Sequence, residues 1–338
     1  MTSPATQPSP MLFFDTVTAY QRSQVIKAAV ELDLFTAIGE GAATTPEIAA
    51  RIGASERGVR ILCDYLATTG FLTKTDGRYG LTQDSAIFLD RRSPAYAGGI
   101  VGFMMSPQLM GAFEDLATVV RTGTTASGDE GTMEADHPVW IEFARGMAAL
   151  LALPADFMAE TAALDPAKKV RVLDLAAGHG IFGIKFLERY PNAEVVAVDW
   201  KNVLEVAAEH AEQAGVADRW TPLAGSAFEV DYGGTYDVVL LTNFLHHFDA
   251  ETNTELLRKV HAALGEGGLA LTLEFVPNDD RVTPPSQATF PMVMLASTRA
   301  GDAYTFAELE RMFGDAGFSQ SEMHLIPPGV QTLIVSRK

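Results

Sequence analysis

Apolar positions along the first part of the chain follow a helical period. From about residue 12 to residue 34 they return every three or four residues, which predicts amphipathic helix. Thr45-Pro46-Glu47-Ile48 is typical of a helix start, with proline in the first turn. Residues 45–51 and 57–68 therefore indicate two helices, joined by a tight turn at Gly53-Ala54-Ser55.

A predicted hairpin follows these two helices. Two short runs, 70–73 and 78–82, flank Asp76-Gly77, and aspartate–glycine between such runs is a strong hairpin signal. Together the helices and the hairpin predict a winged helix-turn-helix, a motif that is common in transcription regulators. However, the second helix carries only two basic residues, Arg57 and Arg60, whereas a helix that faces DNA phosphates is usually richer in them. We therefore expect this motif to serve packing and dimerisation.

The pattern changes after Pro166. Residues 107–164 are mostly helical in period, whereas apolar runs of β type alternate with amphipathic helices beyond them. The clearest predicted strands are 170–175, 195–198, 236–241 and 269–275. Such alternation predicts parallel strands joined by crossover helices, a doubly wound sheet. After Phe318 the segments 322–326 and 331–336 predict two further short strands.

Composition and charge exclude several classes of function. With 47% hydrophobic and 20% charged residues the protein has an ordinary globular composition, and at 338 residues two domains are the default expectation. Acidic residues exceed basic ones, 43 against 25, which argues against nucleic acid and anionic membranes as partners. Cys63 is the single cysteine, so neither a disulfide framework nor a thiolate metal site is expected. The sequence shows no secretory signal and no membrane-spanning apolar run, which predicts a soluble cytoplasmic protein.

The most informative segment is a predicted strand that runs into a glycine-rich turn, Val170 to Gly183. Gly178 and Gly180 would let backbone amides approach a ligand closely, because no Cβ intervenes. Asp199 follows nineteen residues after Gly180, at the end of the next predicted strand. An acid there can accept hydrogen bonds from both ribose hydroxyls of an adenosine.

Two interpretations of this turn stay open from the residues alone. Gly178, Gly180 and Gly183 also match the dinucleotide fingerprint, so a nicotinamide dehydrogenase is the rival. That frame would bury the lone carboxylate of Asp174 inside a strand, which is costly. A frame that begins at Asp174 and continues through Ala176 would instead place the acid at the mouth of the strand. There it could help to hold the cationic amino-acid end of S-adenosylmethionine.

Five short motifs share their order and spacing with a known family. They are Phe143–Met147, Asp174–Gly180, Asp199-Trp200, Gly225–Phe228 and Leu245–Phe248. With them the chain resembles the class I S-adenosylmethionine-dependent methyltransferases, and among these the small-molecule O-methyltransferases with an N-terminal dimerisation domain. Plant phenolic and bacterial antibiotic-tailoring enzymes belong to that group. The resemblance implies an α/β Rossmann-like domain with a mostly parallel seven-stranded sheet and a C-terminal antiparallel hairpin, preceded by a mainly α-helical winged-helix dimerisation domain.

By this resemblance the chain divides into three parts. Residues 11–105 would form the winged-helix dimerisation domain, 106–164 a helical connector that contributes to the acceptor pocket, and 165–338 the S-adenosylmethionine-binding domain. The implied protein is a homodimer that methylates a small molecule in secondary metabolism and releases S-adenosylhomocysteine. As in dimers of the family, Phe13 and Phe14 could reach the partner's site from the first helix.

The resemblance also assigns a cofactor-binding set. Asp199 would hold the ribose, and Trp200 would pack beside the adenine, with a plain core tryptophan as the alternative. Family members commonly have an acidic residue where Ser226 stands and a glycine where Ala176 stands, so the chain departs from the pattern at both positions. The predicted set is Asp174, Ala176, Gly178, Gly180, Asp199, Trp200, Ser226, Ala227, Phe228 and Asn243.

Two adjacent histidines follow the predicted strand 236–241, at the carboxyl end where ligands bind in open α/β sheets. On an extended backbone their side chains would point apart, and they lack the spacing and the cysteines of a zinc site, so no metal is expected. A histidine titrates near neutrality and suits proton removal from a hydroxyl. The resemblance gives that catalytic role to His246, places His247 at a usually acidic position and makes Glu274 a flanking carboxylate. The family's second flanking carboxylate falls on Ala303 and is missing.

Methionine and aromatic residues cluster on both sides of the cofactor motifs. Such stripes usually form core, but methionine also lines pockets for flat apolar ligands. The predicted acceptor-binding residues are Met104, Phe143, Met147, His247 and Met292. They favour an aromatic or polyketide-like acceptor; the resemblance favours a hydroxyl oxygen, and methylation of nitrogen or carbon stays open. The alternatives are a dimeric regulator that binds S-adenosylmethionine and a family-like protein that uses the cofactor for other chemistry.

Overall fold

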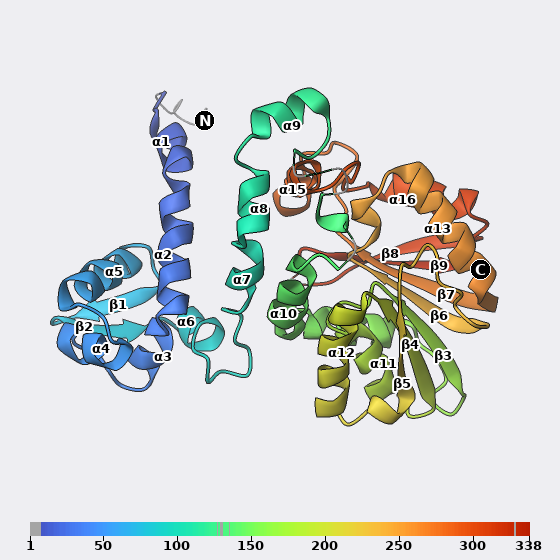
Figure 1. Ribbon diagram of the computed structural model, residues 1–338, viewed down its shortest axis with the longest axis horizontal. Helices are drawn as coiled ribbons and strands as arrows, with labels where there is room; N and C mark the ends of the chain where they lie inside the picture. The colour runs from blue at the N-terminus through green and yellow to red at the C-terminus, as the bar shows by residue number, and fades with distance from the viewer. Residues whose placement is uncertain (1–7, 127, 129–130, 135, 328) are drawn as a thin grey trace, which may run out of the picture. The chain divides into compact units, whose positions relative to one another are not determined.

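The computed structural model of the chain describes residues 8–126, 128, 131–134, 136–327 and 329–338. The chain forms two compact units, Met1–Val101 and Gly102–Lys338 (Figure 1). The segment 106–164, predicted as a connector, lies within the second unit. No helix among the described residues is long and apolar enough to span a lipid bilayer.

The first unit contains the predicted helix-turn-helix and hairpin. Its elements are α1 (Met11–Val17), α2 (Ala19–Glu31), α3 (Leu34–Gly39), α4 (Thr45–Ile52), α5 (Glu56–Thr68), β1 (Leu72–Thr75), β2 (Arg78–Leu81) and α6 (Gln83–Phe88). Helix α4 begins with a capping box, in which the side chains of Thr44 and Glu47 each accept a hydrogen bond from the other residue's backbone N–H. Asp76 and Gly77 both have positive φ, which a two-residue hairpin turn requires. The predicted winged helix is therefore confirmed.

Helix α1 contributes nothing to the core of the first unit. That core contains Leu34, Phe35, Ile48, Val59 and Leu66, all at most 1% exposed. In contrast, none of the residues of α1 is buried, and Phe13 and Phe14 expose 65% and 54% of their surface. A contiguous exposed apolar surface of this kind is typical of an interaction site.

Seven strands of the second unit, counted over the described residues, form one sheet in the order β5-β4-β3-β6-β7-β9-β8. They are β3 (Val170–Leu175), β4 (Ala193–Asp199), β5 (Trp220–Ala224), β6 (Tyr236–Thr242), β7 (Leu264–Glu274), β8 (Gln320–Leu325) and β9 (Thr332–Arg337). Neighbouring strands are parallel except in the pairs β7–β9 and β8–β9. The predicted doubly wound sheet with its C-terminal antiparallel hairpin is confirmed.

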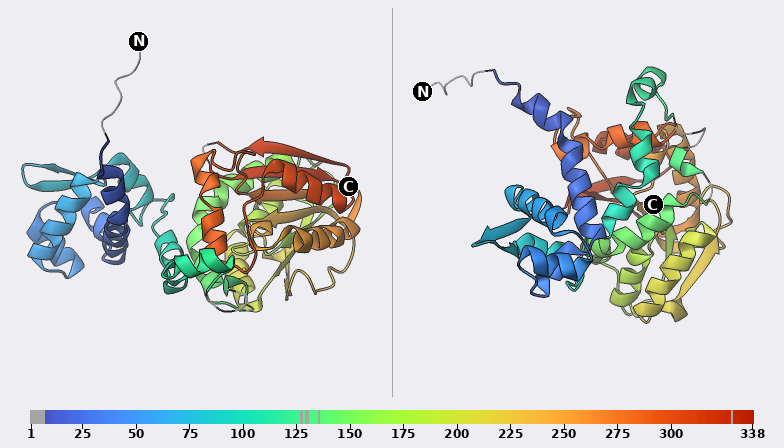
Figure 2. Two further views of the ribbon diagram at one scale, coloured as in Figure 1. Left: turned by 90° about the horizontal axis from the view of Figure 1, so that it is seen from above. Right: turned by 60° about the vertical axis from the view of Figure 1, so that its left-hand side comes forward.

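Helices cover both faces of this sheet. The main ones are α10 (Val139–Thr161), α11 (Ile181–Arg189), α12 (Lys201–Gln213), α13 (Ala250–Ala263) and α16 (Phe306–Asp315). Apart from these sheet-covering helices, the chain forms the shorter helices α7 (Ile100–Met104), α8 (Pro107–Ala112), α9 (Leu116–Thr122), α14 (Pro285–Ala288) and α15 (Pro291–Ser297), and the 3-10 turns η1 (Gly131–Met133), η2 (Ala217–Arg219) and η3 (Leu245–His247). Helices α10, α11 and α12 pack on one face, and α13 and α16 on the other (Figures 1 and 2). Because both faces are buried, the central strands are apolar almost throughout.

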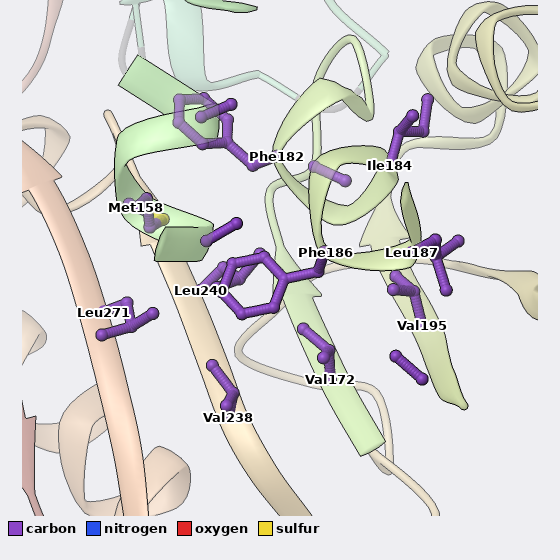
Figure 3. Packing of buried hydrophobic residues seen from close by; sticks show 14 of the residues in the cluster. Met158, Val172, Phe182, Ile184, Phe186, Leu187, Val195, Val238, Leu240 and Leu271 are labelled. Carbon is purple, nitrogen blue, oxygen red and sulfur yellow. The ribbon is translucent and has the colours of Figure 1, made fainter. Parts of the chain in front are cut away.

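The face beneath α10 and α11 shows how the strands are oriented (Figure 3). Phe186 of α11 and Met158 of α10 pack with Val172 and Leu240 of the two central strands. Leu173, the next residue along β3, belongs to the core on the opposite face, as strand alternation requires. This packing fixes the central strands, so the loops at their carboxyl ends start from a rigid base.

Two strands of the sheet depart most from the sequence prediction, whereas the bounds of the others agree within about three residues. Strand β5 was not predicted, because its five residues include Pro222, which a strand tolerates mainly at a sheet edge, and β5 is an edge strand. Strand β7 begins at residue 264 rather than 269, because Gly265, Gly267 and Gly268 hide its apolar pattern.

Candidate active site

A tight loop follows β3 at the carboxyl edge of the sheet. Its backbone is left-handed at Ala176, Gly178 and Gly180, with φ of 51°, 56° and 73°. A Cβ at position 178 would lie 3.1 Å from the ring of Phe143, and one at position 180 would lie 3.0 Å from the Cβ of Ala207. Glycine therefore suits both positions for its small size as well as for its backbone freedom. Ala176 adopts the same backbone with a side chain, which costs an L-residue about 1–2 kcal/mol.

Asp199 ends β4 and fastens this loop. Its Oδ2 accepts the N–H of Gly178 at 2.8 Å, and its Oδ1 accepts the N–H of Trp200 at 2.7 Å. A carboxylate oxygen has two lone pairs, so each oxygen can still accept a second hydrogen bond. Burial raises the pKa of Asp199 to about 6, against the two backbone hydrogen bonds that lower it, so the group is ionised at neutral pH.

A cavity of about 130 Å³ opens beside this carboxylate. Its lining consists of Ala176, Val198, Asp199, Trp200, Gly225, Ser226, Ala227, Phe228, Phe244 and Phe248. The structure thus brings together most of the predicted cofactor residues. An anion at one wall and aromatic and aliphatic groups at the others suit a ribose and its base.

Asp174 does not lie at the mouth of its strand, so that expectation is wrong. Its side chain is fully buried inside β3, where Oδ2 accepts the N–H of Gly183 at 3.1 Å and Oδ1 has no partner among the described residues. Burial raises its pKa to about 7. A Cβ at position 183 would come within 2.9 Å of Asp174 Oδ2, so this third glycine serves the packing of α11 on β3. Asp174 therefore stabilises the start of α11, the helix that follows the loop, through the N–H of Gly183.

Asn243, the residue after β6, is bound by another side chain. It lies at the end of β6 with φ of 54°, a conformation that asparagine tolerates better than most residues. Its side-chain oxygen accepts a hydrogen bond from Gln331, which precedes β9. Asn243 is not among the residues that line the cavity, so its predicted cofactor contact is not brought together with the others.

His246 and Glu274 form a buried pair at the ends of β6 and β7. His246 Nδ1 lies 2.5 Å from Glu274 Oε2. The other oxygen, Oε1, accepts the backbone N–H groups of Phe244 at 3.1 Å, Leu245 at 2.8 Å and His246 at 3.4 Å. An ionised carboxylate can only accept, so the imidazole donates from Nδ1 and keeps a lone pair on Nε2. A base whose tautomer is set by a third group has this arrangement.

The backbone at the two histidines is the 3-10 turn η3 rather than an extended segment. Their rings are consequently adjacent, with centroids 4.3 Å apart, so the expectation that they point apart does not hold. The His247 ring also meets the ring of Trp140 edge to face at 5.3 Å. Burial, together with His246, holds the pKa of His247 well below its usual range, and its Nδ1 is buried without a partner among the described residues.

A second cavity, of about 460 Å³, adjoins the first. It shares Phe228 and Phe248 with it and is also lined by His247, Asp249, Thr252, Arg299 and Ala300. Of the two histidines, His247 is the one that lines this cavity.

The position of the missing second carboxylate is closed in this chain. Ala303 is fully buried, and the backbone N–H of the preceding Asp302 donates to the carbonyl oxygen of His246 at 3.0 Å. The Asp302 carboxylate lies 3.5 Å from Arg281 Nη1. Asp302 thus holds the histidine segment through its backbone, and its carboxylate pairs with Arg281.

The predicted acceptor-binding residues fall into two groups. Phe143 meets Trp140 and Phe103 edge to face, at 5.9 Å and 5.2 Å, and Met147 packs on the core beneath α10. Met104 and Met292 expose 54% and 42% of their surface.

Two further aromatic rings lie near His246. Phe290 meets His246 edge to face at 4.9 Å and stacks on Phe275 at 4.0 Å. The His246 ring, the candidate base, therefore lies in an aromatic environment.

Sequence reasoning missed two residues that hold the cofactor loops. The ring of His179 stacks between Phe143 and Phe182 at 5.6 and 5.7 Å, and burial lowers its pKa to about 3. Lys259 donates to three backbone carbonyl oxygens of the segment that follows β5. In the sequence His179 is simply the residue between two glycines, and Lys259 is one lysine of a predicted helix. Neither pattern indicates a contact with the cofactor loops. Within the described part of the chain, no group of three or more histidine, cysteine or acidic residues is placed to hold a metal ion.

Comparisons with known proteins cover both units. The O-methyltransferase domain family matches residues 113–319, and the O-methyltransferase dimerisation domain family matches residues 14–91. Among curated proteins, the 3-hydroxy-5-methyl-1-naphthoate 3-O-methyltransferase of Streptomyces sahachiroi is 31% identical over 334 residues, which are 97% of this chain and 95% of the relative.

Solved structures show the same architecture. A protein from Nostoc punctiforme that is assigned to the O-methyltransferases superimposes with a TM-score of 0.94 at 52% identity, covering 98% of this chain and 100% of its own. Human N-acetylserotonin methyltransferase, solved in complex with S-adenosylmethionine, has a TM-score of 0.85 at 21% identity and covers 100% of this chain and 99% of its own. At 21% identity, the similarity to the human enzyme supports the fold alone.

Proposed function

Since the chain belongs to the O-methyltransferase family and carries that family's dimerisation domain, we propose that it acts as a homodimer on a small aromatic or polyketide-like acceptor. The methyl donor of the family is S-adenosylmethionine. In this proposal His246 is the general base that removes a proton from an acceptor hydroxyl. The exposed apolar surface of α1 supports the dimer. Arg60 and Lys74 of the winged helix both pair with Asp64, which does not favour the regulator alternative.

The residues around the smaller cavity fit the cofactor. Asp199 has lone pairs left for ribose hydroxyls, and Trp200 and Phe228 offer apolar walls for the adenine ring. Gly178 has no Cβ, so the loop backbone can approach the cofactor closely. Ser226 and Ala227 complete the lining on the side of the predicted adenine. When bound there, the cofactor supplies a methyl group that a positively charged sulfur has already activated. The protein's own task is then to orient the acceptor and to remove a proton.

The observation that carries the proposed mechanism is the hydrogen bond between His246 and Glu274. Glu274 fixes the Nδ1–H tautomer, so Nε2 can take the proton of the acceptor hydroxyl and raise the nucleophilicity of its oxygen. The imidazolium that forms is stabilised by the buried carboxylate 2.5 Å away. Three backbone N–H groups that donate to the other carboxylate oxygen hold the Glu274 side chain in its orientation.

The acceptor class follows from the surroundings of this base. Phe290 and Phe275 flank His246, and Trp140 flanks His247, which suits a flat aromatic ring. We assign Phe143, Met147, Met104 and Met292 to the acceptor side, and His247 to a polar group of the acceptor, because its buried nitrogen has no partner among the described residues. By their names, one curated relative acts on a hydroxynaphthoate and another is an O-methyltransferase of tetracenomycin polyketide synthesis.

Calorimetric titration with S-adenosylmethionine, S-adenosylhomocysteine and NAD is the first test. Binding of the two sulfur compounds without NAD is expected; binding of NAD alone would overturn the proposal. Mass spectrometry of a panel of phenols, matched anilines and carbon nucleophiles should then show a gain of one CH₂ unit in the phenols. Transfer to anilines or carbon in preference to phenols would reject the hydroxyl acceptor. Unaltered turnover by His246→Ala would remove His246 from the mechanism.

A further inference from the structure

Lys259, on the inner side of α13, gathers three backbone carbonyl oxygens of one short segment. Its Nζ lies 3.0 Å from the oxygen of Ala227, 2.9 Å from that of Phe228 and 2.7 Å from that of Val230. An ammonium group has three N–H donors, so this arrangement uses all of them. The same nitrogen lies 4.2 Å from the ring centroid of Tyr232, within cation–π range.

The segment held in this way, residues 225–231, forms one wall of the smaller cavity. Ser226, Ala227 and Phe228 line that cavity, whereas Lys259 is not among the lining residues. The segment turns tightly, since the Ser226 carbonyl oxygen accepts the N–H groups of both Glu229 and Val230 at 3.0 Å. Lys259 therefore holds two of the lining residues, Ala227 and Phe228, through their backbone oxygens without itself lining the cavity.

A second side chain shares the task. The hydroxyl of Tyr232 donates to the Ala227 carbonyl oxygen at 2.6 Å, so this oxygen accepts from two side chains. Tyr232 is 5% exposed. Burial lowers the pKa of Lys259, against the effect of Asp231 and Glu229. Partial burial of a charged ammonium group costs free energy, and here all three of its N–H donors bind the same loop. The side chain therefore has a structural role in this loop.

We propose that Lys259 is a positioning residue for the methyl donor: by fixing residues 225–231 it sets the affinity of the purine end of the cofactor without contacting it. The inference rests on the proposed function, because that function places an adenosine in this cavity. It deepens the proposed function by adding a residue from outside the lining to the cofactor site.

The test replaces Lys259 by methionine, which keeps the apolar stem and removes the three donors. The dissociation constant of S-adenosylhomocysteine should rise about tenfold, the scale of one charge-assisted hydrogen bond, with a matching rise in KM for S-adenosylmethionine. Because the base and acceptor side are untouched, kcat should stay within about twofold. Amide hydrogen exchange over residues 225–231 should become faster.

Lys338→Met is the matched control. Lys338 Nζ also donates to backbone carbonyls, those of His261 at 2.7 Å and Leu264 at 2.6 Å, at the C-terminal end of α13 and outside the segment 225–231. Its loss should lower the melting temperature in a similar way and leave the affinity for S-adenosylhomocysteine unchanged. Equal loss of affinity in both variants would overturn the inference, because it would indicate a general effect on stability.

Tyr232→Phe covers the case in which Lys259→Met does not fold. It removes one donor from the Ala227 carbonyl and should weaken S-adenosylhomocysteine binding about threefold, with faster exchange in the same segment. Wild-type affinity in every folded variant would refute the role of Lys259 while leaving the proposed function intact. Failure of the wild-type protein to bind S-adenosylhomocysteine would instead reject the proposed function.

Discussion

Replacing Glu274 by glutamine tests whether a carboxylate sets the tautomer of the base. The substitution keeps the length of the side chain and an oxygen that can accept the N–H groups of Phe244 and Leu245. However, it turns an amide N–H toward His246 Nδ1, which must then accept. The proton moves to Nε2, and the lone pair that faces the acceptor is lost.

The expected loss follows from the scale of general-base catalysis. Such catalysis contributes ~10²–10⁴-fold, so we expect Glu274→Gln to lower kcat by about 10³-fold, or about 4 kcal/mol of transition-state stabilisation. In the proposed mechanism Glu274 acts through His246 and does not contact either substrate, and it is absent from the lining of both cavities. KM for the two substrates should therefore change by no more than about threefold.

Initial rates on a phenolic acceptor from the panel measure kcat, and thermal unfolding followed by circular dichroism measures stability. Glu274→Ala is the companion variant, because it leaves three backbone N–H groups without their acceptor, each of which costs about 1–3 kcal/mol when buried. It should melt well below the wild type, while Glu274→Gln should melt close to it. A folded Glu274→Gln protein with nearly wild-type kcat would refute the reasoning.

Three further predictions concern the cofactor loops. Ala176→Gly should raise the free energy of unfolding by about 0.5–1 kcal/mol in chemical denaturation, because glycine adopts the left-handed backbone at position 176 without strain; a destabilised variant would contradict this. Ser226→Asp, which supplies the acid common in the family, should tighten S-adenosylhomocysteine binding about tenfold by calorimetry, and unchanged affinity would show that the adenine amino group does not face this position. In the proposed site the ionised form of Asp199 would accept the ribose hydroxyls. Burial raises its pKa to about 6, so the dissociation constant of S-adenosylhomocysteine should rise as pH falls through about 6. Asp199→Asn should bind more weakly and lose this dependence, and a pH-independent wild-type affinity would speak against the assignment.

Much of the fold was accessible from the sequence because the central strands are buried on both faces. Strand β3 was predicted with its observed bounds, since every residue in Val170–Leu175 is at least partly buried and most are apolar. The edge strand β5 lacks that signal, because it is short and contains Pro222. The short length of β5 and its proline thus explain why β5 was not predicted, whereas the other edge strand, β8, was.

The candidate site was predictable only where a motif marks it. Asp199, Ser226 and Phe228 line one cavity as expected, because glycine turns and strand ends have a recognisable spacing. The burial of Asp174 depends on the packing of α11, and the contact between the two histidine rings depends on the 3-10 turn η3; no local pattern indicates either. Contacts between distant segments decide such details.

Two of the three tryptophans of this chain stand beside the candidate site, and this gives the protein a built-in optical reporter. Trp200 borders the smaller cavity, Trp140 contacts the ring of His247, and both pack against one small apolar cluster beneath α12. Trp220 is buried on β5 and would contribute a constant background. Ligand occupancy can therefore be followed by intrinsic fluorescence without a label, and Trp200→Phe would separate the emission of one subsite from that of the other.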